Sequence, residues 1–141
     1  MNKCEMMETW FQRVWHEEDL DAIDEMMDAT VSVIGLQKTP QVGPGVFRVF
    51  AQALLVHIKD IKITIEQFVE QGDWCSMLMH ISATGRDTGA PVSFSGLAMV
   101  RIVNERFAEA YNYIDFIELY EQIGVMPKDT MARCLGGTSL T

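Results

Sequence analysis

The chain has 141 residues, of which 48% are hydrophobic and 22% are charged, and its net charge is −9. This length is typical of one globular domain with its own core, and the composition excludes disordered and collagen-like proteins. Eleven basic residues stand against 20 acidic ones, without a basic run. We therefore expect neither nucleic acid nor an anionic membrane as a partner.

Cysteine and histidine usage argues against disulfides and metal. The three cysteines (Cys4, Cys75 and Cys134) are far apart, and no Cys/His pattern has the spacing of zinc ligands. We expect free thiols, a cytoplasmic location and no metal site. The first ten residues lack the apolar stretch of a signal peptide, and no run approaches the length of a membrane span.

Three helices are predicted in the first half of the chain. Apolar residues between Met6 and Trp15 recur at helical spacing. A short second helix is predicted after Asp19, because aspartate is a favoured N-cap. A short strand over 31–34 then leads through a loop to Pro44, which fits the first position of a third helix because it lacks the N–H that has no partner there.

The second half predicts strands. Ile61, Ile63 and Ile65 alternate with polar residues, so one face of that strand is buried and the other is solvated. Further elements are strands over 74–84, 92–103 and 107–114 and a last helix over 115–123. Tight turns between successive strands indicate an antiparallel sheet.

The order of these elements predicts an α+β fold, because helices gathered before a sheet cover one of its faces. We expect a curved antiparallel sheet with the N-terminal helices over its concave face and a central pocket between the layers. Residues 1–127 form this domain, and residues 128–141 form a C-terminal tail with little periodicity.

Four stretches of the chain resemble the SnoaL-like polyketide cyclases of the nuclear transport factor 2-like superfamily. They are Trp15–Asp24, Gly43–Val46, Pro91–Gly96 and Tyr111–Asp115. Members of that family close a polyketide ring by aldol chemistry without metal or cofactor. The resemblance therefore implies a cone-shaped fold, a largely apolar pocket, no cofactor, and a match between Asp115 and the family's acid/base aspartate.

Asp115 is the first candidate catalytic residue. Aldol closure needs one proton removed beside a carbonyl and one delivered to its oxygen, and a carboxylate desolvated in an apolar pocket can do both. On an unbroken strand Tyr111 and Tyr113 share a face with Asp115, so their hydroxyls can hold a substrate oxygen. The alternative role of Asp115 is the N-cap of the last helix, with Glu118 three residues on.

His80 is the second catalytic candidate, because a neutral imidazole can relay protons or orient a carboxylate. The alternative is a core histidine without a catalytic role. Trp15, Phe50 and Met99 complete the predicted contacts with substrate. The methionines equally suit a core or a dimer face.

Two functions remain open from the sequence. The first is a cofactor-free cyclase or isomerase that acts on a small hydrophobic carbonyl compound, with Asp115 as the acid/base. The second is a non-catalytic protein that binds a small hydrophobic ligand or serves as a dimerising scaffold. Neither face of the strand over 92–103 is fully polar, so we expect a homodimer formed through the sheet.

Overall fold

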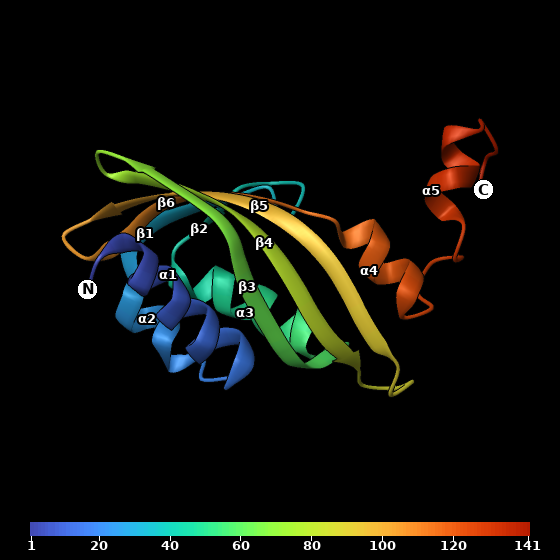
Figure 1. Ribbon diagram of the computed structural model, residues 1–141, viewed down its shortest axis with the longest axis horizontal. Helices are drawn as coiled ribbons and strands as arrows, with labels where there is room; N and C mark the ends of the chain where they lie inside the picture. Colours follow the sequence, from blue (N-terminus) through green and yellow to red (C-terminus); the bar gives the residue numbers. More distant parts are fainter.

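The computed structural model describes residues 1–141 and contains one six-stranded sheet in the order β2-β1-β6-β5-β4-β3. Neighbouring strands are antiparallel except β1 and β6, which are parallel. The strands are β1 (Met27–Ile34), β2 (Gln41–Val42), β3 (Ile58–Gln71), β4 (Trp74–Gly85), β5 (Pro91–Val103) and β6 (Arg106–Ile114). The sheet arches over the N-terminal helices and does not close on itself (Figure 1).

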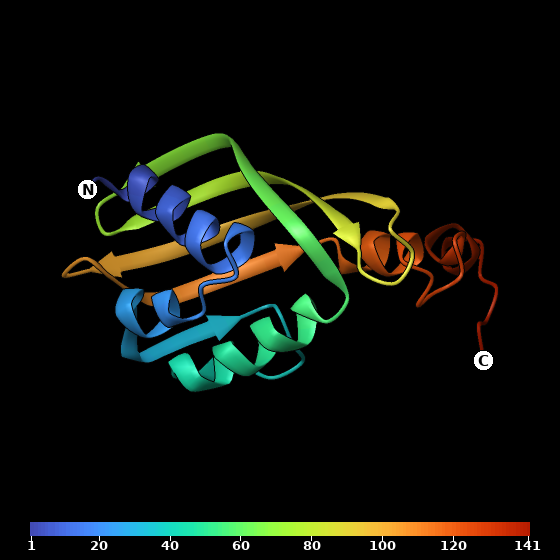
Figure 2. The same cartoon turned by 90° about the horizontal axis from the view of Figure 1, so that it is seen from below.

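Three helical units lie under the concave face of this arch: α1 with its extension η1, α2 and α3 (Figures 1 and 2). Two more helices follow the last strand and extend beyond the end of the sheet. The helices are α1 (Lys3–Trp10), η1 (Phe11–His16), α2 (Asp21–Met26), α3 (Pro44–Leu55), α4 (Phe116–Gln122) and α5 (Thr130–Leu135). The predicted α+β class, with helices over the concave side of a curved sheet, is confirmed.

Alternation along the long strands decides which side chains enter the core. In β4 the buried residues are odd-numbered, from Cys75 to Ala83, and in β5 they are even-numbered, from Val92 to Ile102. The two sets lie on one face because antiparallel register pairs them directly, as with Met77 and Ala98. The helices cover this inner face, and the opposite, outer face carries the remaining side chains.

The first predicted helix consists of two helical types. After α1 the chain continues as a π-helix, η1. In an α-helix, residues four apart are rotated slightly beyond one full turn, because a turn takes about 3.6 residues. In the wider π-helix, residues four apart fall slightly short of one full turn. Met7, Phe11 and Trp15 therefore stay on one side, and all three are buried.

The end of η1 is tied to the sheet and to α3. His16 Nδ1 lies 3.1 Å from the carbonyl oxygen of Ile61 in β3. Arg86, in the turn after β4, contacts both carboxylate oxygens of Glu18 at 2.9 and 3.1 Å and donates to the carbonyl of Leu55. These contacts join η1, the end of α3 and the β4–β5 turn at one end of the molecule.

The parallel pairing of β1 with β6 corrects the prediction of an entirely antiparallel sheet, and four further local features also differ from the prediction. Strand β1 follows α2 without a loop, and the short strand β2 lies in the segment expected to be a loop. Asp19 is not the N-cap residue of α2, although its Oδ1 accepts from the N–H of Asp21 at 3.2 Å. The tail contains the short helix α5, whose six residues are too few to produce a recognisable periodicity.

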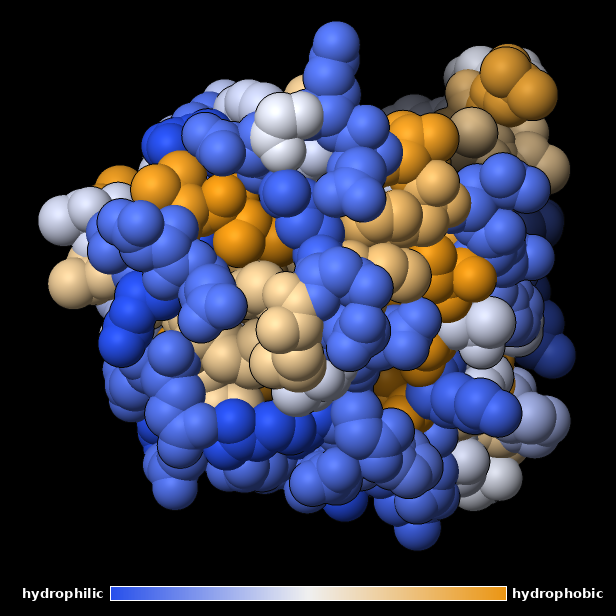
Figure 3. All heavy atoms as spheres, turned by 60° about the vertical axis from the view of Figure 1, so that its left-hand side comes forward, coloured by the Kyte–Doolittle hydropathy of each residue, from blue (hydrophilic) through white to orange (hydrophobic).

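The molecular surface is mixed in polarity. Figure 3 shows a face largely covered by hydrophilic residues, with hydrophobic atoms in patches between them, which is ordinary for a folded protein. None of the helices combines the length and the apolar character needed to cross a bilayer.

Candidate functional site

A cavity of about 90 Å³ lies between the inner face of the sheet and the helices. Of the 23 residues that line it, 22 are hydrophobic, and none carries an ionisable side chain. The lining comes from η1 and the strands of the sheet, with α1, α3 and the residues flanking the strands completing it. It consists of Met7, Trp10, Phe11, Trp15, Met27, Val33, Leu36, Phe47, Phe50, Leu54, Ile58, Ile61, Ile63, Met79, Ile81, Phe94, Ala98, Val100, Phe107, Ala110, Asn112, Ile114 and Phe116.

Aromatic rings form a continuous row along the helical wall. The ring of Trp10 lies 5.1 Å from that of Phe107 and 5.5 Å from that of Phe47. The row continues from Phe47 to Phe50 at 5.9 Å and from Phe50 to Phe116 at 6.3 Å. Tilted and edge-to-face contacts of this kind add to the stabilisation that burial provides, so these contacts stabilise this wall of the cavity.

The cavity opens toward the end of the sheet where α4 begins. Most lining residues are buried, and the half-buried ones mark the mouth. They are Leu36, Phe50, Leu54, Ile63, Asn112, Ile114 and Phe116. The mouth is therefore formed by the loop after β1, the second half of α3, strand β3, and the segment from β6 into α4.

Asn112 is the one polar residue in the lining. Ala110 and Ile114, two residues away on either side, also line the cavity, so the Asn112 side chain projects from the same inner face of β6. No hydrogen bond in the structure involves its side-chain amide. Its neighbours in the sheet are small: Ala98 lies directly opposite, and the backbone of Gly35 approaches from the other side.

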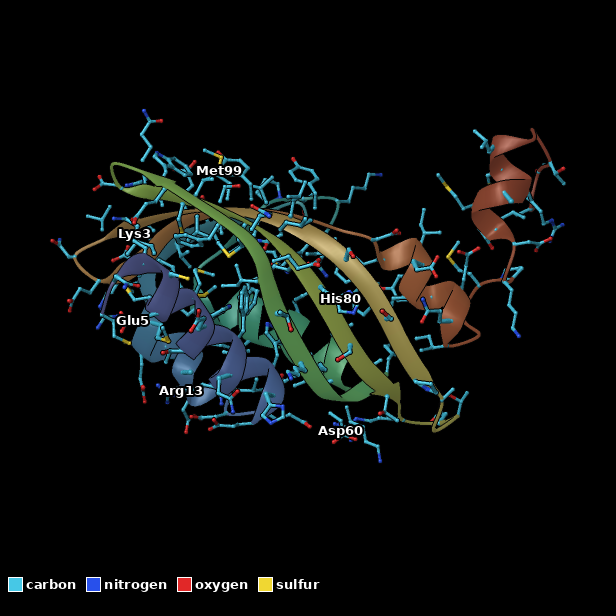
Figure 4. The ribbon with its side chains drawn as sticks, in the orientation of Figure 1. Lys3, Glu5, Arg13, Asp60, His80 and Met99 are labelled. Carbon is cyan, nitrogen blue, oxygen red and sulfur yellow. The ribbon has the colours of Figure 1, made fainter.

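The structure places two of the predicted site residues, Trp15 and Phe50, in the cavity wall. It brings four others, His80, Met99, Tyr111 and Tyr113, to the outer face of the sheet, and it places Asp115 just after the end of β6. Met99 pairs with Tyr111, and Leu97 with Tyr113. Figure 4 shows Met99 on the face turned away from the helices. Only two of the seven predicted site residues therefore line the cavity.

Asp115 is exposed and caps α4, where its Oδ1 accepts from the N–H of Glu118 at 3.1 Å. The capping role considered from the sequence is therefore present. With Tyr113 and Ser95 it borders a shallow, open hollow of about 410 Å³ on the outer face. The residues before and after Asp115, Ile114 and Phe116, both line the inner cavity, so its carboxylate lies beside the mouth but outside the lining.

Two of the other polar candidates, His80 and Tyr111, are already paired on the outer face. His80 Nε2 lies 3.1 Å from Ser93 Oγ. The hydroxyl of Tyr111 donates to Glu109, which also accepts from Arg101. The Tyr111 hydroxyl and then the Arg101 guanidinium lower the pKa of Glu109, and the same hydrogen bond raises the pKa of Tyr111.

Sequence reasoning did not single out Asn112. The alternation that groups it with Ala110 and Ile114 is visible in the sequence, but that signal acquires meaning only once the inner face is known. No group of three or more His, Cys, Asp or Glu side chains is arranged to hold a metal ion.

Comparison with known proteins connects this geometry to a family. The family model of SnoaL-like polyketide cyclases matches residues 5–123. No curated protein matches the chain.

Similar solved structures include a putative polyketide cyclase from Acidithiobacillus ferrooxidans, with 19% identity, 86% of this chain and 93% of that chain covered, and a TM-score of 0.75. IdmH, a putative polyketide cyclase from Streptomyces antibioticus, has 17% identity, 88% and 99% coverage, and a TM-score of 0.75. A hypothetical protein from Catenulispora acidiphila with a ketosteroid isomerase-like fold, in complex with trimethylamine, has 15% identity, 89% and 95% coverage, and a TM-score of 0.74. The family match, over a fold that these structures share, shows that the chain belongs to the SnoaL-like polyketide cyclase family.

Proposed function

We propose that this protein binds one small, neutral, apolar molecule inside the cavity. The observation that carries the proposal is the lining itself, in which 22 of 23 residues are hydrophobic and no side chain is ionisable. A charged ligand would lose its hydration there without gaining a charged partner. An apolar ligand gains from leaving water, at about 25 cal/mol per Å² of buried surface.

The volume sets the size of the ligand. One water molecule needs about 10–15 Å³ of cavity volume, so a cavity of about 90 Å³ accommodates several water molecules. An engineered apolar cavity of about 150 Å³ holds benzene, so this cavity suits a compound of one ring, or of two rings that extend into the mouth. A four-ring compound enters only if the mouth opens.

Thermal unfolding with a size series tests this proposal. We expect benzene-sized and naphthalene-sized compounds to raise the melting temperature, because a ligand at 100 times its dissociation constant stabilises the native state by about 2.7 kcal/mol. A four-ring hydrocarbon and a one-ring carboxylate serve as the size and charge controls and should leave the melting temperature unchanged. The proposal would be contradicted if only the carboxylate raised the melting temperature, or if no compound of the series raised it.

Cyclase or isomerase chemistry is the second candidate, and the family match favours it. Its catalytic carboxylate would be Asp115, which lies between two lining residues but caps α4 instead of facing the cavity. If binding alone is the function, Asp115→Asn should leave ligand affinity unchanged, because asparagine is an equally good N-cap. Asp129→Asn, at the corresponding position before α5, is the matched control.

Calorimetric titration and a turnover assay of the two variants together decide between the candidates. Equal affinities in Asp115→Asn and Asp129→Asn, with no carbonyl compound converted by wild-type protein, support simple binding. A carbonyl compound that wild-type protein and Asp129→Asn convert, and Asp115→Asn does not, would establish catalysis by Asp115 and replace the first proposal.

The outer face supports a homodimer as the assembled form. Its centre carries Leu97, Met99 and Tyr113, which are 54%, 45% and 65% exposed, with Leu78 and Trp74 on the neighbouring strand. The Arg101–Glu109 pair borders this apolar centre on one side. An apolar centre with a polar rim is the usual anatomy of a protein interface.

We expect light scattering to give twice the 16.0 kDa chain mass at micromolar concentration. Leu97→Lys should reduce the mass to that of one chain, because it places a charge at the centre of the interface. Val49→Lys, at a valine of α3 that is 65% exposed, is the control and should remain dimeric. A wild-type mass of one chain would refute the dimer.

A further inference from the structure

We infer that the Asn112 amide is the polar anchor of the cavity, and that the ligand it selects is a one- or two-ring compound carrying a neutral carbonyl oxygen. This inference rests on the proposed binding function and narrows its ligand class. It assigns a role to the residue that departs from an otherwise hydrophobic lining.

The first argument is the state of the amide. Its side chain offers two N–H donors and a carbonyl acceptor, and no residue of the chain bonds to any of them. A polar group that folding brings into an apolar wall without a partner loses part of its hydration. A ligand with a complementary polar atom restores that hydrogen bond, so the amide favours such a ligand over a hydrocarbon of equal shape.

The second argument is the space beside the amide. The residue opposite Asn112 in β5 is Ala98, which also lines the cavity and carries only a methyl group. A larger side chain at this position would crowd the amide. The small side chain of Ala98 leaves space in which a ligand oxygen can approach the amide.

The third argument is charge. No carboxylate, ammonium or guanidinium group lines the cavity, so neither an anion nor a cation finds an opposite charge there. The two carboxylates nearest along the chain are occupied elsewhere: Asp115 caps α4, and Glu109 accepts from Tyr111 and Arg101. The complementary group must therefore be neutral, and a ketone or amide carbonyl accepts from the N–H donors of Asn112 at about 2.9 Å.

A matched ligand pair tests the assignment. Indane and 1-indanone have nearly the same shape, and only the second carries a carbonyl. Their dissociation constants are measured by calorimetry for wild-type protein, Asn112→Leu and the control Gln67→Leu, which removes an amide from an exposed position of β3. We expect the preference for 1-indanone over indane to fall about 3- to 10-fold in Asn112→Leu, because the ligand carbonyl is then buried without a donor. In Gln67→Leu the preference should stay as in wild type.

The outcomes separate this inference from the function on which it rests. If both compounds bind wild-type protein and Asn112→Leu keeps the same preference, the cavity binds ligands but Asn112 is not its anchor. If neither compound binds wild-type protein, the proposed function fails and the inference fails with it. Thermal unfolding confirms that the variants are folded, and Asn112→Ala replaces Asn112→Leu if the larger side chain prevents folding.

A second readout concerns the amide directly. In the ¹H–¹⁵N spectrum the side-chain NH₂ signals of Asn112, assigned by their loss in Asn112→Ala, should shift more on addition of 1-indanone than of indane. Equal shifts with the two ligands would contradict a hydrogen bond to the carbonyl.

Discussion

Replacing Gly35 by alanine should lower the free energy of unfolding by about 2–5 kcal/mol. Gly35 has a φ of +99°, a region that residues with a side chain rarely adopt. A Cβ at this position would lie 1.9 Å from the backbone oxygen of Asn112. That oxygen belongs to a strand in the middle of the sheet, so it cannot move away without breaking the β1–β6 pairing.

Gly45→Ala is the matched control for this variant. Gly45 lies in the first turn of α3, its φ is not positive, and no atom lies within 4 Å of the added Cβ. Alanine there should be neutral or should stabilise the protein by up to about 1 kcal/mol. Urea denaturation of both variants measures the difference, and an equal effect of the two substitutions would contradict the close approach of Gly35 to the backbone of Asn112.

Trp10→Ala is expected to lower the free energy of unfolding by about 3–5 kcal/mol. The Trp10 side chain is buried, contacts Phe47 and Phe107, and lines the cavity. Its removal separates Phe107 from the rest of the aromatic row and leaves a larger void. Because the void is apolar, a ligand too large for the wild-type cavity should bind the variant and restore part of the lost stability.

Trp74→Ala removes the same kind of side chain from the outer face, where Trp74 is half-buried and its ring lies 6.2 Å from that of Tyr111. Trp74→Ala should lower the free energy of unfolding less than Trp10→Ala does. A three-ring hydrocarbon should not raise the melting temperature of Trp74→Ala. Thermal unfolding of both variants with and without that hydrocarbon provides the measurement. Rescue of both variants, or of neither, would contradict the position given to Trp10 in the cavity wall.

Much of the architecture could be predicted from local patterns. The apolar spacing between Met6 and Trp15 located the first helical unit, and Pro44 marked the start of α3. The four long strands and the tight turns between them followed from alternation and turn residues. These features depend on neighbouring residues in the chain, so the sequence carries them directly. The change from α-helix to π-helix at Phe11 depends on fitting three buried side chains against the sheet, and it was not predicted.

The candidate site shows which features local sequence patterns could not predict. The sequence by itself determined that Tyr111 and Tyr113 share one face of a strand while Ala110 and Asn112 share the other, because side chains alternate along a strand. Both faces of the sheet carry apolar residues, so composition could not say which face the helices cover. Only the tertiary structure decided that: packing the apolar stripe of α1 and η1 against one face placed Asn112 in the cavity lining, and it left His80 and Met99 on the other face and Asp115 outside the lining.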